Sequence, residues 1–233
     1  EEGGEESGGM MEQGQQALAA IGTVLDSRFV KLLFVASAFR FCAGYGIGVW
    51  KAPFFREAFP TYLEQFSVAN AFVISGGGVL SSIIGGALAD KFAVNDERVR
   101  LWIPAAGCVL AVPLWYAFCQ STDFTTSIAI LFAEYIVAEC WFGPVLASLY
   151  GAVPKDVRGT SQGLFTVVSA VGNLMPVVIG SLQKENGLSG TLAWTVSVAY
   201  ALAALFFYLA AEELPKQAAA AAAKNAEAEA QEA

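Results

Sequence analysis

Six long apolar blocks dominate this sequence of 233 residues and limit what it can fold into. They lie at about residues 29–50, 67–89, 101–119, 127–150, 163–182 and 192–211. About twenty apolar residues in a helix cross the roughly 30 Å hydrocarbon core of a bilayer. The blocks are continuous rather than alternating, which excludes the strands of a membrane barrel. The sequence therefore predicts an all-α integral membrane protein with six transmembrane helices.

Composition excludes several other classes of protein. Charged residues make up 15% of the chain, whereas soluble domains contain about 25%. This excludes an ordinary soluble enzyme, a nucleic-acid-binding protein and a disulfide-stapled secreted domain. The chain has no histidine, and its four cysteines lie in or beside apolar blocks without forming a CxxC pair. We therefore expect free thiols, no metal and no cofactor.

Lysine and arginine predict the orientation in the membrane. Six spans place both termini on one side, which carries nine of these residues, against three on the other side. The positive-inside rule then places both termini in the cytosol. The membrane itself is either the plasma membrane or an endolysosomal membrane. The chain therefore divides into an acidic head over 1–27, a membrane domain over 28–212 and an Ala/Glu/Lys-rich cytosolic tail over 213–233. We expect the head to be irregular to residue 14 and then to form a possible interfacial helix.

A weak internal repeat relates the first three spans to the last three. The second span contains Ser75-x-x-Gly78 and the fifth contains Ser169-x-x-Gly172, and in both the pattern continues as x7-Gly-x-Leu. Arg40 in the first span and Glu139 in the fourth each stand four residues before a glycine. Because each unit has three spans, two copies enter the membrane from opposite sides. We therefore expect two inverted three-helix repeats, with chance similarity of glycine-rich helices as the alternative.

Three charged residues lie deep inside the apolar blocks, away from their ends. Arg40 is near the middle of the first span, and Glu134 and Glu139 are inside the fourth. A charge at that depth costs several kcal/mol unless it faces protein, water or a partner. We expect the two spans to face a common polar cavity in which Arg40 binds an anionic group or pairs with one of the glutamates. A carboxylate there can carry a proton; which glutamate does so is left open, as is a permanent structural pair. Further candidates for the cavity lining are Tyr45, Trp141 and Asn173.

Small residues indicate where the helices pack closely. The second span carries small residues four apart in two adjacent strips, a spacing that lets helix backbones approach. Glycine and proline in the fifth span predict a bend and a surface that can slide. Static packing is the alternative. The packing residues are Gly77, Ser81, Gly85, Gly86, Gly172, Pro176 and Gly180.

Three stretches together resemble the C-terminal half of a major facilitator superfamily transporter. They are Gly86-Ala-Leu-Ala-Asp90-Lys91-Phe92 followed by Arg98-Val-Arg100, Val153-Pro-Lys-Asp-Val-Arg158-Gly159, and Gly172-Asn173-x-x-Pro176-x-x-x-Gly180. The resemblance implies a twelve-helix fold of which these spans are helices seven to twelve. It also implies a cytosolic gate in which an acid at a helix end pairs with basic loop residues. The gate residues would be Asp90, Lys91, Arg98, Arg100 and Arg158.

Two further patterns resemble the spinster-like group of this superfamily. They are Arg-Phe-x-Ala-Gly-Tyr at 40–45 and Glu-x-Trp-Phe-Gly-Pro at 139–144. The group is linked to sphingolipids or lysophospholipids, so the resemblance implies a lipid-like substrate, with organic anions or sugars as alternatives. Residues 95–97 depart from the usual loop signature.

These observations favour a secondary transporter that works by alternating access and is coupled to protons. The alternatives are a non-transporting six-helix scaffold, sensor or regulatory half-unit, and an intramembrane enzyme, which no nucleophile–base or metal motif supports. We therefore expect no enzymatic activity and no nucleic-acid partner. The expected partners are membrane lipid, a small-molecule or lipid substrate, and either a missing N-terminal half or a second half-unit.

Overall fold

The computed structural model of the chain describes residues 2–232, with side chains for residues 14–217 and 219. Its elements are α1 (Glu2–Asp26), α2 (Arg28–Ala58), η1 (Pro60–Tyr62), α3 (Leu63–Phe72), η2 (Val73–Gly77), α4 (Gly78–Phe92), α5 (Val99–Gln120), α6 (Phe124–Ala138), η3 (Glu139–Trp141), α7 (Phe142–Ala152), η4 (Lys155–Val157), α8 (Arg158–Val171), α9 (Leu174–Asn186) and α10 (Leu188–Glu232). The described residues form helices and no strand. The all-α fold class is therefore confirmed.

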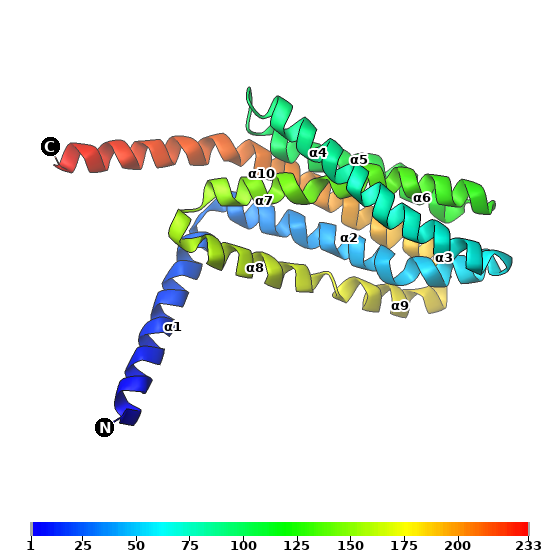
Figure 1. The fold of residues 1–233 in the computed structure, drawn as a ribbon, viewed down its shortest axis with the longest axis horizontal. Helices are drawn as coiled ribbons and strands as arrows, with labels where there is room; N and C mark the ends of the chain where they lie inside the picture. The colour runs from blue at the N-terminus through cyan, green and yellow to red at the C-terminus, as the bar shows by residue number, and fades with distance from the viewer. Residues whose placement is uncertain (1, 233) are drawn as a thin grey trace.

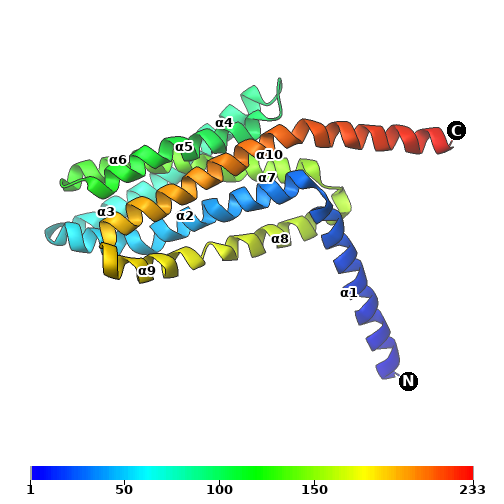
Figure 2. The same ribbon diagram turned by 180° about the vertical axis from the view of Figure 1, so that it is seen from behind.

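Six helical segments of this part of the chain are long and apolar enough to cross a membrane. They are Arg28–Ala58, Pro60–Phe92, Val99–Gln120, Phe124–Ala152, Lys155–Asn186 and Leu188–Gln217. They run side by side as a bundle (Figure 1). The α4–α5 loop, the α7–α8 turn, the start of α2 and the C-terminal part of α10 lie at one end of it, as both views show (Figure 2). The predicted six spans are confirmed; which end is cytosolic stays a prediction.

Local sequence explains where the helices begin and end. The Ser27 side chain accepts a hydrogen bond from the Val30 amide at the start of α2, and Asp123 accepts one from Thr126 at the start of α6. Such caps satisfy amides that have no partner inside the helix. The sharp turn between α9 and α10 uses Gly187 at a φ of 75°, which glycine adopts without a steric penalty.

Three of the six spans are interrupted near their middles. The second contains a π-helical turn over Val73–Gly77, the fourth a 3₁₀ turn over Glu139–Trp141, and the fifth a break between α8 and α9. Pro144 and Pro176 are each the third residue of the helix that follows such a break. Proline has no amide hydrogen to donate to the carbonyl four residues earlier, so the helix stops and restarts.

The breaks follow the internal repeat. Ser75-x-x-Gly78 overlaps the π-helical turn of the second span, and Ser169-x-x-Gly172 ends α8 in the fifth. The Nη2 atom of Arg40 is 2.8 Å from Oε1 of Glu139, so the charged residues at equivalent positions of the two units touch each other. The two inverted three-helix repeats are confirmed as the architecture of the bundle.

Helix α10 occupies the centre of one side of the bundle, where it packs along both α2 and α5. The core between these helices is apolar and aromatic, and includes Trp115, Phe118, Tyr200 and Phe207 with no exposed surface. The second and fifth spans are the least enclosed: only 22% and 17% of their apolar windows are buried, against 39–44% in the other four. These two spans therefore lie at the margin of the bundle.

The N-terminal segment is helical and so differs from the irregular head that we expected up to residue 14. Helix α1 is continuous from Glu2 to Asp26 and leaves the bundle at a steep angle (Figure 1). Val24 near its C-terminal end has no exposed surface and joins the core, which fixes the last turn from which the helix extends. Helix α10 continues through the predicted tail to Glu232. Glu1 and Ala233, which belong to the predicted head and tail, lie outside the described residues.

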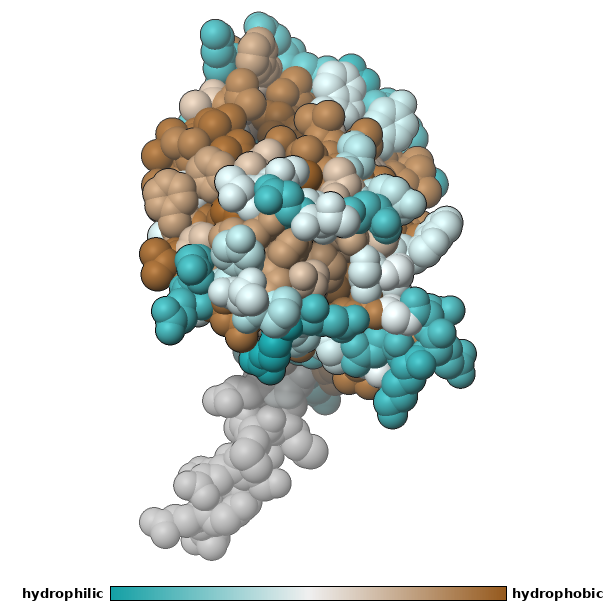
Figure 3. All heavy atoms as spheres, turned by 90° about the vertical axis from the view of Figure 1, so that its right-hand side faces the viewer, coloured by the Kyte–Doolittle hydropathy of each residue, from teal (hydrophilic) through white to brown (hydrophobic). Residues whose placement is uncertain are grey.

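The end of the bundle that carries the α2–α3 and α5–α6 loops has a mixed surface. Hydrophilic and intermediate residues cover much of this end face, and hydrophobic residues gather along its flank (Figure 3). A membrane protein has this distribution because its flank contacts lipid and its ends contact water.

Candidate functional site

The break in the fourth span exposes backbone carbonyl groups inside the bundle. Helix α6 ends at Ala138, and α7 starts at Phe142. The last carbonyls of a helix have no partner within it and need one elsewhere, above all in hydrocarbon. Ser81 of α4 donates to the Ile136 carbonyl at 2.6 Å, and the Cys140 thiol lies 3.1 Å from the Val137 carbonyl.

Arg40 supplies the partner for the next carbonyl. Its Nη2 and Nε atoms donate to the oxygen of Ala138 at 2.9 and 3.3 Å. The same Nη2 forms the 2.8 Å ion pair with Glu139. The guanidinium also lies over the rings of Trp141 and Tyr200, 5.3 Å from each centroid. Arg40 is 2% exposed, so these contacts replace the water that it would otherwise bind.

The two predicted glutamates have different surroundings. The side chain of Glu139 is 35% exposed, although it pairs with the buried Arg40. Glu134 is 1% exposed, and its carboxyl group accepts a hydrogen bond from the hydroxyl of Tyr200, which has no exposed surface. The structure therefore brings Arg40 and Glu139 into direct contact and places Glu134 deeper, against α10.

Two residues of this cluster were missed by sequence reasoning. Lys51 of α2, which we counted beyond the end of the first span, is 5% exposed and donates to the Tyr135 hydroxyl at 3.1 Å. Its ammonium also lies 5.1 Å from the centroid of the Tyr135 ring. The eleven-residue spacing from Arg40 is about three helical turns, which places both cations on one face of α2 and was the available signal. Tyr200 is the second, and a single tyrosine in an apolar block offered no signal.

The other predicted lining residues are not all at the cluster. Trp141 lies at the cluster, where its ring contacts Arg40. Tyr45 lies where α2 meets the fifth span: a Cβ atom at Gly172 would be 2.8 Å from the Tyr45 ring. Asn173 is exposed at the break between α8 and α9 and donates to the Ala170 carbonyl at 3.2 Å.

The described residues do not form the expected gate pairing of Asp90 with Arg98 or Arg100. Arg98 pairs with Asp96 at 2.8 Å and with Glu212 of α10 at 3.4 Å, whereas Asp90 is exposed and has no ion pair among the described residues. Asp96 accepts from both the backbone amide and the guanidinium of Arg98, a local contact that orders only one loop. Hydrogen bonds from Arg98 hold the pKa of the Asp96 carboxyl below its ordinary value. This aspartate belongs to the three residues that depart from the family's loop signature.

The remaining predicted gate residues also form no pair with Asp90 in the described part of the chain. The Lys91 ammonium lies 5.5 Å from the centroid of the Phe92 ring, and the carbonyl of Arg158 accepts from the Ser161 hydroxyl at 2.8 Å. Arg100 lines a hollow with Glu97 and Gln217 at this end of the bundle. Their role in a gate stays a prediction.

One of the two small-residue strips packs closely within this chain. A Cβ atom at Gly77 would be 3.2 Å from Cβ of Tyr135, and one at Gly85 would be 2.6 Å from the carbonyl oxygen of Cys140. Together with Ser81 these glycines let the second span contact the break in the fourth. Gly86, expected to pack in the same way, has nothing within 4 Å of a Cβ atom, because the neighbouring strip faces outward.

The predicted packing residues of the fifth span contact α2. A Cβ atom at Gly172 would be 2.8 Å from the backbone of Phe41, and one at Gly180 would be 3.1 Å from the Trp50 ring. The Trp50 indole donates to the carbonyl of Pro176 at 2.9 Å. The fifth span thus approaches α2 at three points along its length.

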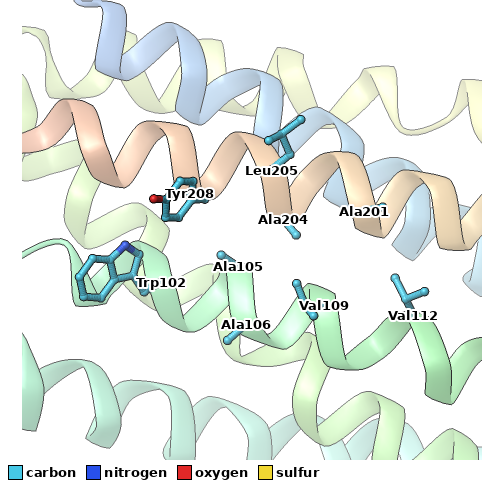
Figure 4. A pocket seen from close by; sticks show the side chains of 9 residues that line it. All are labelled: Trp102, Ala105, Ala106, Val109, Val112, Ala201, Ala204, Leu205 and Tyr208. Carbon is cyan, nitrogen blue, oxygen red and sulfur yellow. The ribbon is translucent and has the colours of Figure 1, made fainter.

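An apolar groove lies between α5 and α10 (Figure 4). Its volume is about 630 Å³, and its lining is almost entirely small and aliphatic, with Trp102 and Tyr208 at one end. Such a surface suits contact with lipid chains rather than recognition of a polar solute. No group of three or more potential metal ligands occurs among the described residues.

The fold and the site define an integral membrane protein with the architecture of half a secondary transporter. Inverted three-helix repeats, broken helices and charged groups at the break are the features on which such folds build their binding sites.

Known proteins with this architecture resemble the chain. An MFS-type efflux pump of Mycolicibacterium smegmatis is 25% identical over 155 residues, which are 66% of this chain and 36% of the pump. The crystal structure of a bacterial homologue of the human lysosomal transporter Spinster, inward-facing and unoccupied, matches with a TM-score of 0.72 at 19% identity. The match covers 87% of this chain and 50% of that one. No protein-family model matches the chain.

The predicted resemblance to major facilitator superfamily transporters is confirmed as a similarity to the pump in sequence and to the solved Spinster homologue in fold. The chain spans about half of the solved relative and about a third of the pump.

Proposed function

We propose that the chain is the C-terminal half of a secondary transporter that moves a small organic or lipid-like solute by alternating access, coupled to protons. The observation that carries this proposal is the ion pair of Arg40 and Glu139 at the break in the fourth span. An arginine is suited to bind a carboxylate or phosphate because its planar fork donates two parallel hydrogen bonds. In this proposal an anionic group of the solute takes the place of Glu139.

The surroundings of the pair support such an exchange. The arginine is almost fully buried, whereas the Glu139 side chain is 35% exposed and so reachable by water. When Glu139 leaves, Arg40 keeps the Ala138 carbonyl and its two aromatic neighbours. A solute can therefore replace the carboxylate without leaving a buried cation unsupported.

The contacts of the broken spans support a change of conformation. Gly85 brings the second span against the break in the fourth, and Gly172 brings the fifth span against α2. Backbone-to-backbone contacts of this kind allow small sliding movements of packed helices. In the proposal these two contacts rearrange when the cavity opens to the other side.

A second six-helix half completes the cavity in this proposal. The second and fifth spans are the least buried, and the match covers 50% of the solved relative. Exposed strips on both spans contain glycines with nothing within 4 Å of a Cβ atom: Gly78, Gly86, Gly159 and Gly163. These strips are where the N-terminal half of the same polypeptide, or a second half-unit, would pack.

The test uses the native full-length protein reconstituted in liposomes with a proton gradient. Uptake of radiolabelled lysophosphatidylcholine and of the organic anion p-aminohippurate is measured for the wild type and for Glu139→Gln. Glu64→Gln is the matched control, because Glu64 is exposed and lies outside the cluster. The proposal predicts uptake of at least one probe by the wild type and the control, and its loss in Glu139→Gln with the fold retained.

Two results would contradict the proposal. Uptake of neither probe by folded wild-type protein would favour a non-transporting scaffold or regulatory half-unit. Uptake that is unchanged in Glu139→Gln would show that the ion pair serves packing alone.

A further inference from the structure

Glu134 is a buried acid without a cationic partner. It is 1% exposed, and the Tyr200 hydroxyl is the hydrogen-bond partner of its carboxyl group among the described residues. The two buried cations of α2 are already occupied: Arg40 binds Glu139 and the carbonyl of Ala138, and Lys51 binds the Tyr135 hydroxyl.

The charge environment of Glu134 comes from four parts of the bundle. The titratable and charged groups that influence it are Arg40 and Lys51 of α2, Cys108 and Cys119 of α5, Tyr135 and Glu139 of its own span, and Tyr200 of α10. The charges of Arg40 and Lys51 are balanced only if both glutamates are ionised. Of these two glutamates, however, only Glu139 forms an ion pair within the described residues, and Glu134 does not. An ionised carboxylate that is removed from water and unpaired is strongly disfavoured, whereas a protonated carboxyl group with one hydrogen bond is not.

We infer that Glu134 holds a proton at neutral pH and is the proton carrier of the site, whereas Glu139 is the carboxylate that a solute displaces. This division of roles rests on the proposed function. Burial and bonding partner distinguish the two glutamates. Glu139, which water can reach, forms the ion pair, and Glu134, in the dry core, carries the proton.

Tyr200 connects the proton carrier with the anion site. Its hydroxyl bonds Glu134, and its ring lies under the guanidinium of Arg40. On release, the O–H bond of the Glu134 carboxyl group breaks and the proton passes to a water molecule in the opened cavity. The carboxylate that remains accepts from the Tyr200 hydroxyl, with Arg40 as a neighbouring cation. A change in what Arg40 binds therefore changes how easily Glu134 loses its proton, which couples the two sites.

The direct test is infrared spectroscopy of the native full-length protein in lipid nanodiscs. At neutral pH the wild type should show the carbonyl band of a protonated carboxyl group, and the band should be absent from Glu134→Gln. Glu64→Gln, at an exposed glutamate outside the cluster, is the matched control and should retain the band. Tyr200→Phe removes the hydrogen bond and should shift the band without abolishing it. A band that is unchanged in Glu134→Gln overturns the inference.

Transport provides a second measurement. Glu134→Gln keeps the shape of a neutral carboxyl group, so exchange of labelled for unlabelled solute should continue while accumulation driven by the proton gradient is lost. Retained proton-driven accumulation overturns the role as carrier. A wild type that shows the infrared band but transports neither probe overturns the proposed function instead, and the band still decides whether Glu134 is protonated.

Discussion

Replacing Gly85 with alanine tests the close contact between the second span and the break in the fourth. The added Cβ atom would lie 2.6 Å from the carbonyl oxygen of Cys140 and 2.9 Å from its Cα atom, both of which belong to the backbone. Overpacking of this kind costs about 1–3 kcal/mol. Alanine also favours a helix interior over glycine by about 1 kcal/mol. The variant should therefore lose up to about 2 kcal/mol of unfolding free energy.

Gly86→Ala is the matched control, one residue further along the same helix. Its Cβ atom would meet nothing within 4 Å, so only the gain in helix propensity applies. Because that gain is common to both variants, the difference between them equals the overpacking cost of about 1–3 kcal/mol. Reversible unfolding by sodium dodecyl sulfate in mixed micelles measures it. Equal stabilities of the two variants would refute the contact on which the sliding surface depends.

Three further predictions follow from the contacts at other places. Arg40→Gln should cost about 3 kcal/mol in the same unfolding titration, the lower end for a broken buried ion pair, because the carboxylate partner is one-third exposed; an unchanged midpoint would contradict the pairing. Gly172→Ala should be less stable than Gly163→Ala by about 1–3 kcal/mol, since its Cβ atom would lie 2.8 Å from the backbone of α2 and the other meets nothing within 4 Å. Asp96 should stabilise the loop at neutral pH, because Arg98 lowers its pKa, and that contribution should be lost as the pH falls from about 3.9 through the lowered value. The thermal midpoints of wild type and Asp96→Asn should then differ at neutral pH and converge in acid.

The six spans could be predicted because their signal is compositional and long. The interruptions inside them could be predicted only in part: Pro176 and Gly172 indicated a bend in the fifth span, but nothing in the second indicated a π-helical turn. The local conformation at a break depends on which side chains reach the freed carbonyls. Arg40 and Ser81 reach them from other helices, which a single sequence does not reveal.

The charged cluster was predictable where its residues lay far from the ends of a span. Arg40 and Glu139 met that condition, and they form the ion pair. Lys51 did not, because a lysine near the end of an apolar block usually reaches the interface. Here α2 continues to Ala58, and the lysine turns inward to Tyr135.

For the gate, by contrast, the sequence predicted a contact that the described part of the chain does not contain. A motif predicted that Arg98 or Arg100 would bind Asp90. Arg98 instead binds a residue two positions away in sequence, because Asp96 accepts from both its amide and its guanidinium. Such a contact costs less ordering than one between separate segments. Motif spacing alone did not include this local competitor.

The mass of the native polypeptide tests the central claim most directly, namely that these six spans form one half of a transporter. An antibody raised against residues 216–233 would detect it in membranes of the source organism. The account predicts a band at about twice the 24.5 kDa of this chain, or a band at 24.5 kDa that purifies as a stable assembly of two half-units. A 24.5 kDa polypeptide that purifies as a monomer would contradict it.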